Sequence, residues 1–353
     1  MGKTMCALFD LDSSKLESES MIVDLPSKER AFSDAVSLLF DNFTNEHFSN
    51  SLEIPYGFED FVTTVYKFHN QKIDKMSFYE LRDEVTLENS NKVLIGFSGG
   101  LDSCYLACRL KSKGYEVVLF HVDNLNSYAQ PNEDNYAREF AKHGGFEYIE
   151  VNFKPRKHNF FNENPIKNQL VLAFMLDYVI ENNINNIGLG CDWTQTLDDS
   201  TVGLDATDSK EFNETFWKAV ERVVHNVNLI FCEDEVKKVD RIAFLLENYT
   251  ELFQYVYSCV LPYRFTKSSH ERNESKYGVP LLKGRCGSCV KCCREFLYLV
   301  HLGWYNERDE ETNKFCEHCW DILANSKYAV LPEKYKLSLP LEVRWKNLLE
   351  EGS

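Results

Sequence analysis

Residues 98–103 read SGGLDS and lie between two regular stretches of the chain. The apolar run Val93–Phe97 precedes them, and apolar residues at helical spacing follow as far as Gly114. A strand, a glycine-containing turn and the start of a helix form a site for an oxyanion, because the backbone can approach the ligand and the N–H groups and helix dipole favour negative charge. The hydroxyls of Ser98 and Ser103 add two further donors.

Asp102 is the one member of this turn that repels an anion. A divalent cation between its carboxylate and the phosphates removes that repulsion, and Mg²⁺ is the usual ion at such sites. The turn lacks the Gly-Lys-Ser/Thr ending of a Walker A loop. These residues therefore predict a nucleotide-phosphate site with Mg²⁺, and an ordinary glycine-containing turn is the alternative.

Length and charge narrow the class of protein. The chain has 353 residues, 44% of them hydrophobic, which is enough for one large or two modest domains with a core. The 39 Lys and Arg against 55 Asp and Glu give a net charge of −16, which argues against a general nucleic-acid or anionic-membrane binder. With no apolar run of membrane-spanning length, no evident secretory leader and 12 cysteines, the sequence predicts a cytoplasmic protein with reduced thiols.

Short apolar runs alternate with helical patterns between residues 93 and 250, which predicts a doubly wound α/β fold with a parallel five-stranded sheet. The expected strands are Val93–Phe97, Glu116–Asp123, Phe146–Phe153, Asn186–Asp192 and Asn228–Cys232. The expected helices are Asp102–Ser112, Glu133–Lys142, Ile166–Asn182, Lys210–Val224 and Lys238–Glu247. Such sheets bind ligands at the carboxyl ends of their strands, where His121–Asp123 and Gly190–Trp193 fall.

We expect four segments along the chain. Residues 1–90 form an N-terminal extension of unknown role, with a strand-like Met21–Leu25 and a helix-like Glu29–Phe43. The other three are the nucleotide-binding domain 91–255, the metal-binding segment 256–302 and a tail of unknown role, 303–353.

Thiols at the spacing of metal ligands lie in the third segment. Two overlapping Cys-x-x-Cys steps follow a distant cysteine, and the best ligand set is Cys259, Cys286, Cys289 and Cys292. Four thiolates around one point suit tetrahedral Zn²⁺ in a closed, structural site. Cys293 is an alternative fourth ligand, and an iron–sulfur cluster or metal-free core cysteines are the alternative states.

A second thiol pair, Cys316 and Cys319, follows this set. Its one additional candidate ligand nearby is His301, and a single Cys-x-x-Cys step has many non-metal uses. We therefore expect core or surface thiols at these two positions, with a second metal as the alternative.

The SGGLDS turn matches, at every fixed position, the SGGxDS pattern of the pyrophosphate loop (PP-loop) of N-type ATP pyrophosphatases. Together with the later Ser-Cys…Cys-Gly-x-Cys-x-x-Cys arrangement, the chain resembles 7-cyano-7-deazaguanine synthase over residues 92–300. Lys238-Val239-Asp240 fits the helix start of that family. Lys167-Asn168 and Asp208-Ser209-Lys210 stand where the family has Arg-Asn and Asp-Cys-Arg.

The resemblance implies an enzyme that cleaves ATP between the α and β phosphates, with Mg²⁺ and Zn²⁺ as metals. It activates the carboxylate of 7-carboxy-7-deazaguanine and uses ammonia to form an amide and then a nitrile, as in queuosine-type biosynthesis. The implied nucleotide-binding residues are Phe97, Ser98, Gly99, Gly100, Leu101, Asp102, Ser103, His121, Val122, Asp123 and Gly190. The implied catalytic residues are Asp102, Ser103, Lys167 and Lys210, and the implied substrate-binding residues are Asn168, Asp192 and Asp208.

Several alternatives stay open at this point. Relatives in phage-encoded pathways and antiphage defence are thought to conjugate a deazaguanine to the N-terminal amine of a partner protein. A PP-loop tRNA-modifying enzyme is a further alternative, against which the net charge of −16 argues. A non-enzymatic scaffold is another alternative, but such a protein has little use for the carboxylate of Asp102. For His121 the two alternatives are a general base and a structural histidine at a strand end. The relatives are often dimers, so a homodimer is expected by analogy.

Overall fold

The computed structural model describes most of the chain after residue 50. The described residues are 32–33, 36, 43–44, 47–48, 51–68, 72–79, 83–123, 130–152, 167–190, 210–232, 236–259, 261, 263–326 and 332–350. They fall into two compact units. The first contains described residues of the ranges 1–97, 110–127 and 146–231, and the second those of 98–109, 128–145 and 232–353.

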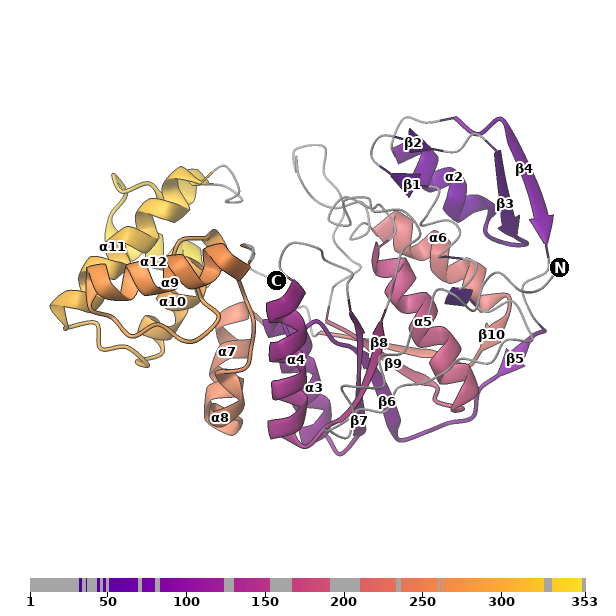
Figure 1. Cartoon of the computed structure of the whole chain (residues 1–353), viewed down its shortest axis with the longest axis horizontal. Coiled ribbons are helices and arrows are strands. Elements are labelled where there is room, and N and C mark those ends of the chain that lie inside the picture. Colours follow the sequence, from indigo (N-terminus) through magenta and orange to yellow (C-terminus); the bar gives the residue numbers. More distant parts are fainter. Residues whose placement is uncertain are drawn as a thin grey trace. The chain divides into compact units, whose positions relative to one another are not determined.

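A five-stranded sheet forms the centre of the first unit (Figure 1). Its strands are β6 (Lys92–Gly96), β7 (Glu116–Asp123), β8 (Glu147–Asn152), β9 (Asn186–Leu189) and β11 (Asn228–Phe231). All neighbours are parallel, in the order β11-β9-β6-β7-β8. Strands β7 and β8 extend the sheet on one side of β6, whereas β9 and β11, which come later in the chain, extend it on the other side. This is the doubly wound sheet that the sequence predicts.

Burial explains why these strands were readable from the sequence. The middle of β6 and all of β9 are buried, as is β7 after Glu116. A strand covered on both faces is a continuous apolar run rather than an alternating one. Strand β11, at the edge of the sheet, is half-buried.

The expected helices are confirmed to within a few residues at their ends. They are α3 (Leu101–Ser112), α4 (Gln130–Gly144), α5 (Lys167–Glu181), α6 (Lys210–Glu221) and α7 (Lys238–Asn248). Gly114, at φ +90°, ends α3 in the left-handed conformation expected of a C-terminal glycine. One boundary was wrong, because α6 ends at Glu221 and Val224 belongs to strand β10 (Val224–His225), which pairs with β5 (Val85–Thr86).

The region before the sheet is part of the first unit. It contains β1 (Phe43–Thr44), β2 (His47–Phe48), β3 (Ser51–Pro55), α2 (Glu59–Phe68) and β4 (Lys75–Tyr79). Strands β3 and β4 are parallel and are joined through α2. Phe61 of α2 packs edge-on against Phe216 of α6, with ring centroids 5.1 Å apart. Aromatic contacts of this kind tie the region to the sheet-covering helices.

An earlier segment is anchored by a buried carboxylate. Phe32, Ser33 and Val36 are helical, which confirms part of the expected helix 29–43, but Phe43 already belongs to β1. Both oxygens of Asp177 in α5 accept backbone hydrogen bonds, from the N–H groups of Phe32 and Ser33, at 2.8 Å each. The expected strand 21–25 lies outside the described residues.

Asparagines hold the amino-terminal edge of the sheet. The Asn186 side chain donates to the carbonyls of Ser90 at 2.7 Å and Lys92 at 3.1 Å, and accepts from Asn228 Nδ2 at 3.0 Å. Asn185 Oδ1 accepts from the Ser90 N–H at 2.9 Å. These bonds fix the chain where it enters β6.

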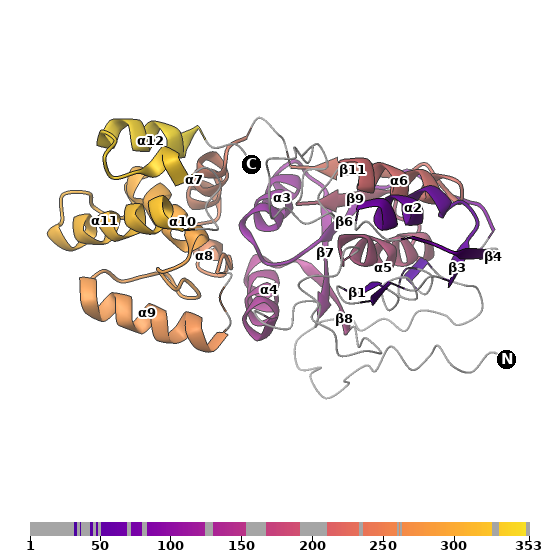
Figure 2. The same cartoon turned by 90° about the horizontal axis from the view of Figure 1, so that it is seen from above.

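The second unit is helical in its C-terminal part (Figure 2). Its further elements are α8 (Thr250–Phe253), α9 (Tyr263–Tyr277), α10 (Val290–His301), α11 (Glu310–Asn325), the 3-10 helix η5 (Pro332–Tyr335) and α12 (Leu341–Leu349). Helices α10 and α11 pack together, with the rings of Phe296 and Phe315 4.6 Å apart. Trp320 lies against Tyr335 and Trp345, so α12 packs onto the helical unit.

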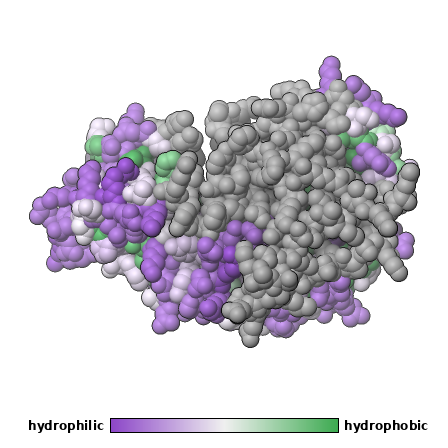
Figure 3. Space-filling model, in the orientation of Figure 1, coloured by the Kyte–Doolittle hydropathy of each residue, from purple (hydrophilic) through white to green (hydrophobic). Residues whose placement is uncertain are grey.

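The described surface in Figure 3 is mainly hydrophilic, in keeping with the charged composition. Among the described helices, none is both long and apolar enough to cross a membrane.

Candidate functional site

Residues 98–103 follow β6 and Phe97 and fold into a tight turn. The Ser98 and Ser103 hydroxyl oxygens lie 3.3 Å apart, and the Gly100 N–H donates to Ser98 Oγ at 3.3 Å. Gly99 has φ +73°, where a side chain is strained, and a Cβ there would lie 3.4 Å from the Ala137 backbone nitrogen. The turn therefore needs glycine at this position. Its small residues gather two hydroxyls beside the start of α3.

The turn is bonded to the segment that leads to the cysteines. Tyr257 donates its backbone N–H to the Gly99 carbonyl at 2.8 Å, and Cys104 Sγ donates to the same oxygen at 3.4 Å. The Tyr257 ring packs against Tyr136 of α4, with centroids 5.4 Å apart. A residue two positions before Cys259 thus fixes the backbone of the turn.

Asp102 is paired with a buried arginine. Arg241 Nη1 donates to Asp102 Oδ1 at 2.7 Å; the Arg241 side chain is 2% exposed and that of Asp102 35%. The Arg241 guanidinium also lies over the Tyr105 ring, 5.8 Å from its centroid. Arg241 was not predicted from the sequence, because its burial beside Val239 and Ile242 is a property of the folded helix.

A second cation of α7, Lys238, lies three positions before Arg241. Lys238 is half-buried, and its pKa is lowered, first by burial and then by the charges of Arg294, Lys291 and Arg241. The Asp102 carboxylate acts in the opposite direction. The basic side chain in contact with the turn is Arg241.

The candidate residues of the sheet lie at its carboxyl edge, in the first unit. The Phe97 N–H donates to the Phe120 carbonyl at 2.8 Å, and His121 Nδ1–H donates to the Phe97 carbonyl at 2.7 Å. Because a carbonyl only accepts, that bond assigns the proton to Nδ1. His121 is buried and ties β7 to the end of β6, which is the structural interpretation of this histidine. Val122 and Asp123 are also buried.

The candidates on the substrate side are described only in part. Lys167 and Lys210 are the first residues of α5 and α6, and Asn168 is half-buried. Gly190 follows β9 directly. The described residues do not include Asp192 or Asp208, nor the side chains of the two lysines.

A buried amide pair links the starts of these two helices. Gln169 Nε2 donates to Asn213 Oδ1 at 2.7 Å, and both side chains are buried. Neither residue was predicted from the sequence. A polar residue near the start of each helix was the available signal.

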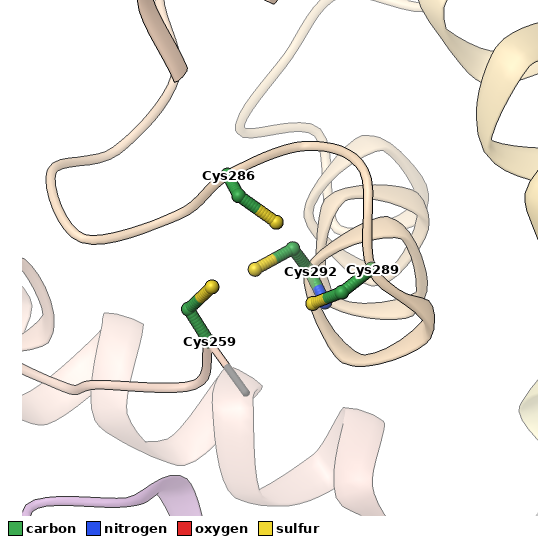
Figure 4. Close-up of side chains that lie close together, drawn as sticks. All are labelled: Cys259, Cys286, Cys289 and Cys292. Carbon is green, nitrogen blue, oxygen red and sulfur yellow. The ribbon is translucent and has the colours of Figure 1, made fainter. Parts of the chain in front are cut away.

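Four sulfurs converge in the second unit (Figure 4). The Sγ atoms of Cys259, Cys286, Cys289 and Cys292 all lie within 4.8 Å of one another, and all four side chains are buried. Cys259 follows α8, Cys286 and Cys289 flank the turn before α10, and Cys292 is in its first turn. Sulfurs about 2.3 Å from a single ion lie roughly 3.8 Å apart in a tetrahedron, so this set fits one metal ion.

The protonation of the four thiols supports this assignment. Hydrogen bonds from Cys286, Cys289 and Cys292 lower the pKa of the Cys259 thiol. The corresponding bond raises the pKa values of Cys286 and Cys292. A buried thiolate surrounded by thiols is an electron-rich site in which a cation replaces the protons.

The other cysteines of this region are core thiols. Cys293 donates to the Gly287 carbonyl at 3.7 Å, and a hydrogen bond with Cys319 raises its pKa well above the usual value. Cys316 and Cys319 are buried. In the described part of the chain, the four-cysteine set is the one group suited to a metal. Of the expected core or surface positions for these two thiols, the structure has them in the core.

Comparisons with known proteins add little to this geometry. No family model and no curated protein matches the chain. Among solved structures, the U34-tRNA thiolase NcsA from Methanococcus maripaludis, with its [4Fe-4S] cluster, is similar at a TM-score of 0.26 and 16% identity. The match covers 48% of this chain and 71% of that chain. A likeness at this level assigns neither ligand nor activity, so the fold class rests on the sheet described above.

The second unit therefore brings together a glycine-containing turn with two hydroxyls, a carboxylate held by an arginine, and four converging thiols suited to one metal ion. This is an environment for charge neutralisation and positioning.

Proposed function

We propose that this protein is an ATP-dependent adenylating ligase of the N-type ATP pyrophosphatase kind. The observation that carries the proposal is the SGGLDS turn itself. It follows the central strand β6, has Gly99 in the left-handed region and gathers its two serine hydroxyls within 3.3 Å. Such a turn suits the pyrophosphate portion of ATP, which is an extended anion.

The proposed roles follow from the groups present. Ser98, Gly99, Gly100 and Ser103 hold the β and γ phosphates. The Asp102 carboxylate would hold Mg²⁺, which would supply charge neutralisation at the departing pyrophosphate. Arg241 fixes the direction of that carboxylate through Oδ1. The nucleoside contacts implied for Phe97, His121–Asp123 and Gly190 in the first unit, and for Leu101 in the second, stay predictions.

The proposed reaction is carboxylate activation. A carboxylate oxygen of 7-carboxy-7-deazaguanine attacks the α-phosphorus of ATP, and the bond to the bridging oxygen breaks with release of pyrophosphate. Ammonia then attacks the acyl carbon, AMP leaves, and a proton is lost to give the amide. In a second cycle the amide oxygen attacks the α-phosphorus of another ATP and displaces pyrophosphate, and loss of AMP and of the two protons on nitrogen gives the nitrile. The residues of this chain contribute positioning and charge rather than a covalent step.

The substrate is the finer part of the proposal. Lys167 and Lys210 are proposed to offset carboxylate or phosphate charge at the starts of α5 and α6. Asn168, Asp192 and Asp208 are proposed to contact the deazapurine. The two lysines stand where the resembling family has arginine. A planar guanidinium that can make two parallel hydrogen bonds is thus replaced by an ammonium group, which acts as a point charge.

We propose Zn²⁺ at the four cysteines. Sulfurs within 4.8 Å of one another share one ion. Each iron of a cluster takes its own thiolate, and such thiolates lie further apart than those on a single ion. With four protein ligands the site is closed, so its proposed role is to organise the second unit.

Mass spectrometry of a complete reaction tests the proposal. The mixture contains full-length protein, ATP, Mg²⁺, 7-carboxy-7-deazaguanine and ammonium, with Asp60→Asn, an exposed aspartate of α2, as the matched control for Asp102→Asn. AMP, pyrophosphate and the amide or nitrile are expected from the wild type and the control. If AMP forms and mass is added to a partner protein, the acceptor is a protein amine. That result supports the alternative that uses the same activation step. Absence of AMP and pyrophosphate with every acceptor contradicts the proposal.

A cytoplasmic location and a homodimer are further expectations, which fractionation and light scattering test.

A further inference from the structure

The last segment of the chain contacts the loop that carries two of the converging thiols. Helix α11 belongs to residues 303–353, for which the sequence predicts no role and which lie beyond the resemblance at 92–300. Within the second unit it packs against both α10 and α9. The loop 286–289 leads into α10 (Figure 4) and meets side chains from α9 and α11.

Gly287, in the middle of this loop, lies where a side chain has no room. Its φ is +65°, and an added Cβ would lie 2.8 Å from Phe315 Cζ and 3.0 Å from Asn273 Nδ2. Phe315 comes from α11 and Asn273 from α9. The loop is therefore enclosed by both helices at this residue.

Side chains of the same two helices hold two consecutive carbonyls of the loop. His318 Nε2 lies 3.0 Å from the Gly287 carbonyl oxygen, and Asn273 Nδ2 donates to the Cys286 carbonyl at 2.8 Å. Because a carbonyl only accepts, the proton of His318 is on Nε2. Asn273 Nδ2 also donates to Ser288 Oγ at 2.8 Å. Three consecutive residues of the loop are thus bonded to helices outside the Cys-x-x-Cys step.

The two donors are themselves fixed by packing. The ring centroid of His318 is 5.2 Å from that of Tyr277 and 5.5 Å from that of Phe315. His318 is half-buried and Asn273 is buried. A side chain that is already ordered by its neighbours makes a hydrogen bond with little further loss of conformational freedom. These contacts make both side chains rigid supports for the loop.

A metal site gains from such supports. Thiolates around one point repel one another, and a free loop relieves that repulsion by opening. A loop held by its carbonyls keeps its sulfurs together, so it loses less conformational freedom when an ion binds. The Ser288 N–H donates to Cys286 Sγ at 3.3 Å, which connects the held backbone to a ligand sulfur. The bonds from Asn273 and His318 therefore act on the direction of that sulfur.

We propose that His318 and Asn273 are positioning residues of the metal site, which clamp the loop 286–289 and hold Cys286 and Cys289 in the arrangement that binds Zn²⁺. This inference rests on the proposed zinc site and extends it to the last segment of the chain. The second Cys-x-x-Cys step then contributes a histidine that supports the site already described, rather than ligands for a second ion.

The zinc affinity of the full-length protein, measured by chelator competition, tests the clamp. His318→Leu removes the donor, whereas His318→Gln keeps an N–H donor at a similar reach. We expect the first variant to bind zinc about tenfold or more weakly and the second to stay within about threefold of the wild type. The matched control, His301→Leu, makes the same change at an exposed position of α10 and should leave the affinity unchanged.

Asn273→Leu tests the other side of the clamp. It removes the bonds to the loop from α9 at nearly constant volume, and we expect a loss of zinc affinity of about tenfold. Asn313→Leu, at an exposed position of α11, is its control. Co²⁺ in place of zinc gives a second measurement, because the visible absorption of a tetrahedral Co²⁺ site depends on the arrangement of its sulfurs. The spectrum should change in folded His318→Leu and match the wild type in His318→Gln, whereas a residue that supports only the fold would leave it unchanged.

The outcomes separate this inference from the proposed zinc site. If the wild type binds no stoichiometric zinc, the zinc site and the clamp fail together. If the wild type binds zinc and folded His318→Leu and Asn273→Leu bind it equally well, the clamp is refuted and the zinc site stands. Circular dichroism monitors the fold. Should His318→Leu not fold, His318→Asn decides, because its side chain stays polar but is too short to reach the Gly287 carbonyl, and wild-type affinity in that variant refutes the clamp.

Discussion

Arg241 holds one oxygen of the Asp102 carboxylate at 2.7 Å while the aspartate side chain stays 35% exposed. The arginine is buried, so it is a fixed support for a carboxylate that reaches solvent on its other side. A carboxylate supported in this way has one oxygen engaged and a defined direction. Both are properties of a metal-facing ligand.

The pair makes Asp102→Asn a cleaner test than Asp102→Ala. The amide oxygen of Asn still accepts from Arg241, so we expect a native fold and a loss of AMP formation of at least about 100-fold. Asp102→Ala removes the carboxylate from a buried guanidinium and should also lower the free energy of unfolding by about 1–3 kcal/mol, less than for a fully buried pair because Asp102 is partly exposed. Urea denaturation and a pyrophosphate-release assay measure the two effects. Undiminished turnover by either variant refutes the role of Asp102.

Gly99→Ala should impair the turn more than it impairs the fold. Its φ of +73° strains any side chain, and the new Cβ lies 3.4 Å from the Ala137 backbone. We expect pyrophosphate affinity to fall by about tenfold or more. Gly114→Ala is the matched control, since its φ is +90° and no atom lies within 4 Å of the added Cβ. It should lower stability by about 1 kcal/mol and leave binding unchanged, as calorimetry and urea melts of both variants will show. Equal binding by the two variants contradicts a role for the Gly99 backbone.

Metal binding by the four cysteines should strengthen as the pH rises. The pKa values of Cys286 and Cys292 are raised by hydrogen bonds to the Cys259 thiolate, so an incoming ion must displace their protons. Zinc affinity, measured by chelator competition, should therefore fall as the pH is lowered. Cys289→Ser should abolish stoichiometric zinc, whereas Cys316→Ser should retain it. Full chelation is expected to unfold the C-terminal helices rather than to block chemistry selectively, and loss of activity with an intact circular dichroism spectrum contradicts that.

The lowered pKa of Lys238 predicts opposite trends for stability and binding at alkaline pH. Burial and neighbouring cations lower the pKa of Lys238 from its usual value of 10.5. Between the lowered pKa and 10.5, the lysine is therefore protonated in the unfolded chain but neutral in the native one. The free energy of unfolding relative to Lys238→Met should then rise with pH in that range. Pyrophosphate affinity should fall over the same range, because only the charged amine binds an anion. Urea denaturation and calorimetry across this range test both trends, and parallel trends contradict the assignment.

Asp177 should support the N-terminal segment. An Asn at this position has a single acceptor oxygen for the two backbone N–H groups of Phe32 and Ser33, so Asp177→Asn is expected to cost about 2 kcal/mol. Glu181→Gln, an exposed change in the same helix, is the control. Urea midpoints give the cost. Limited proteolysis should show faster cleavage before residue 51 in Asp177→Asn alone, and identical cleavage of the two variants excludes this anchor.

Local patterns account for what the sequence predicted correctly. Strand β7 was delimited to the residue because its eight positions form one apolar run between polar ends, and the cysteine spacing identified all four converging sulfurs. Gly114 marked the end of α3 for a similar reason. Each of these signals lies within a few residues along the chain.

Long-range contacts account for what the sequence left out. Strand β10 exists because Val224 pairs with Val85, and two residues leave no periodicity to detect. Arg241 and Asp102 are 139 positions apart, so neither indicates the other without a folded chain. The parallel pair β3–β4 likewise depends on the intervening α2.

The Gln169–Asn213 bond has a consequence for how substrate range can change. It fastens the first turns of α5 and α6 to each other across 44 positions of sequence, and β9 secures the chain at Leu189. Residues 190–209 connect these two secured positions in the sequence. We therefore expect the starts of α5 and α6 to keep their pairing when this stretch is varied in a library, which makes it a practical region for changing the range of substrates.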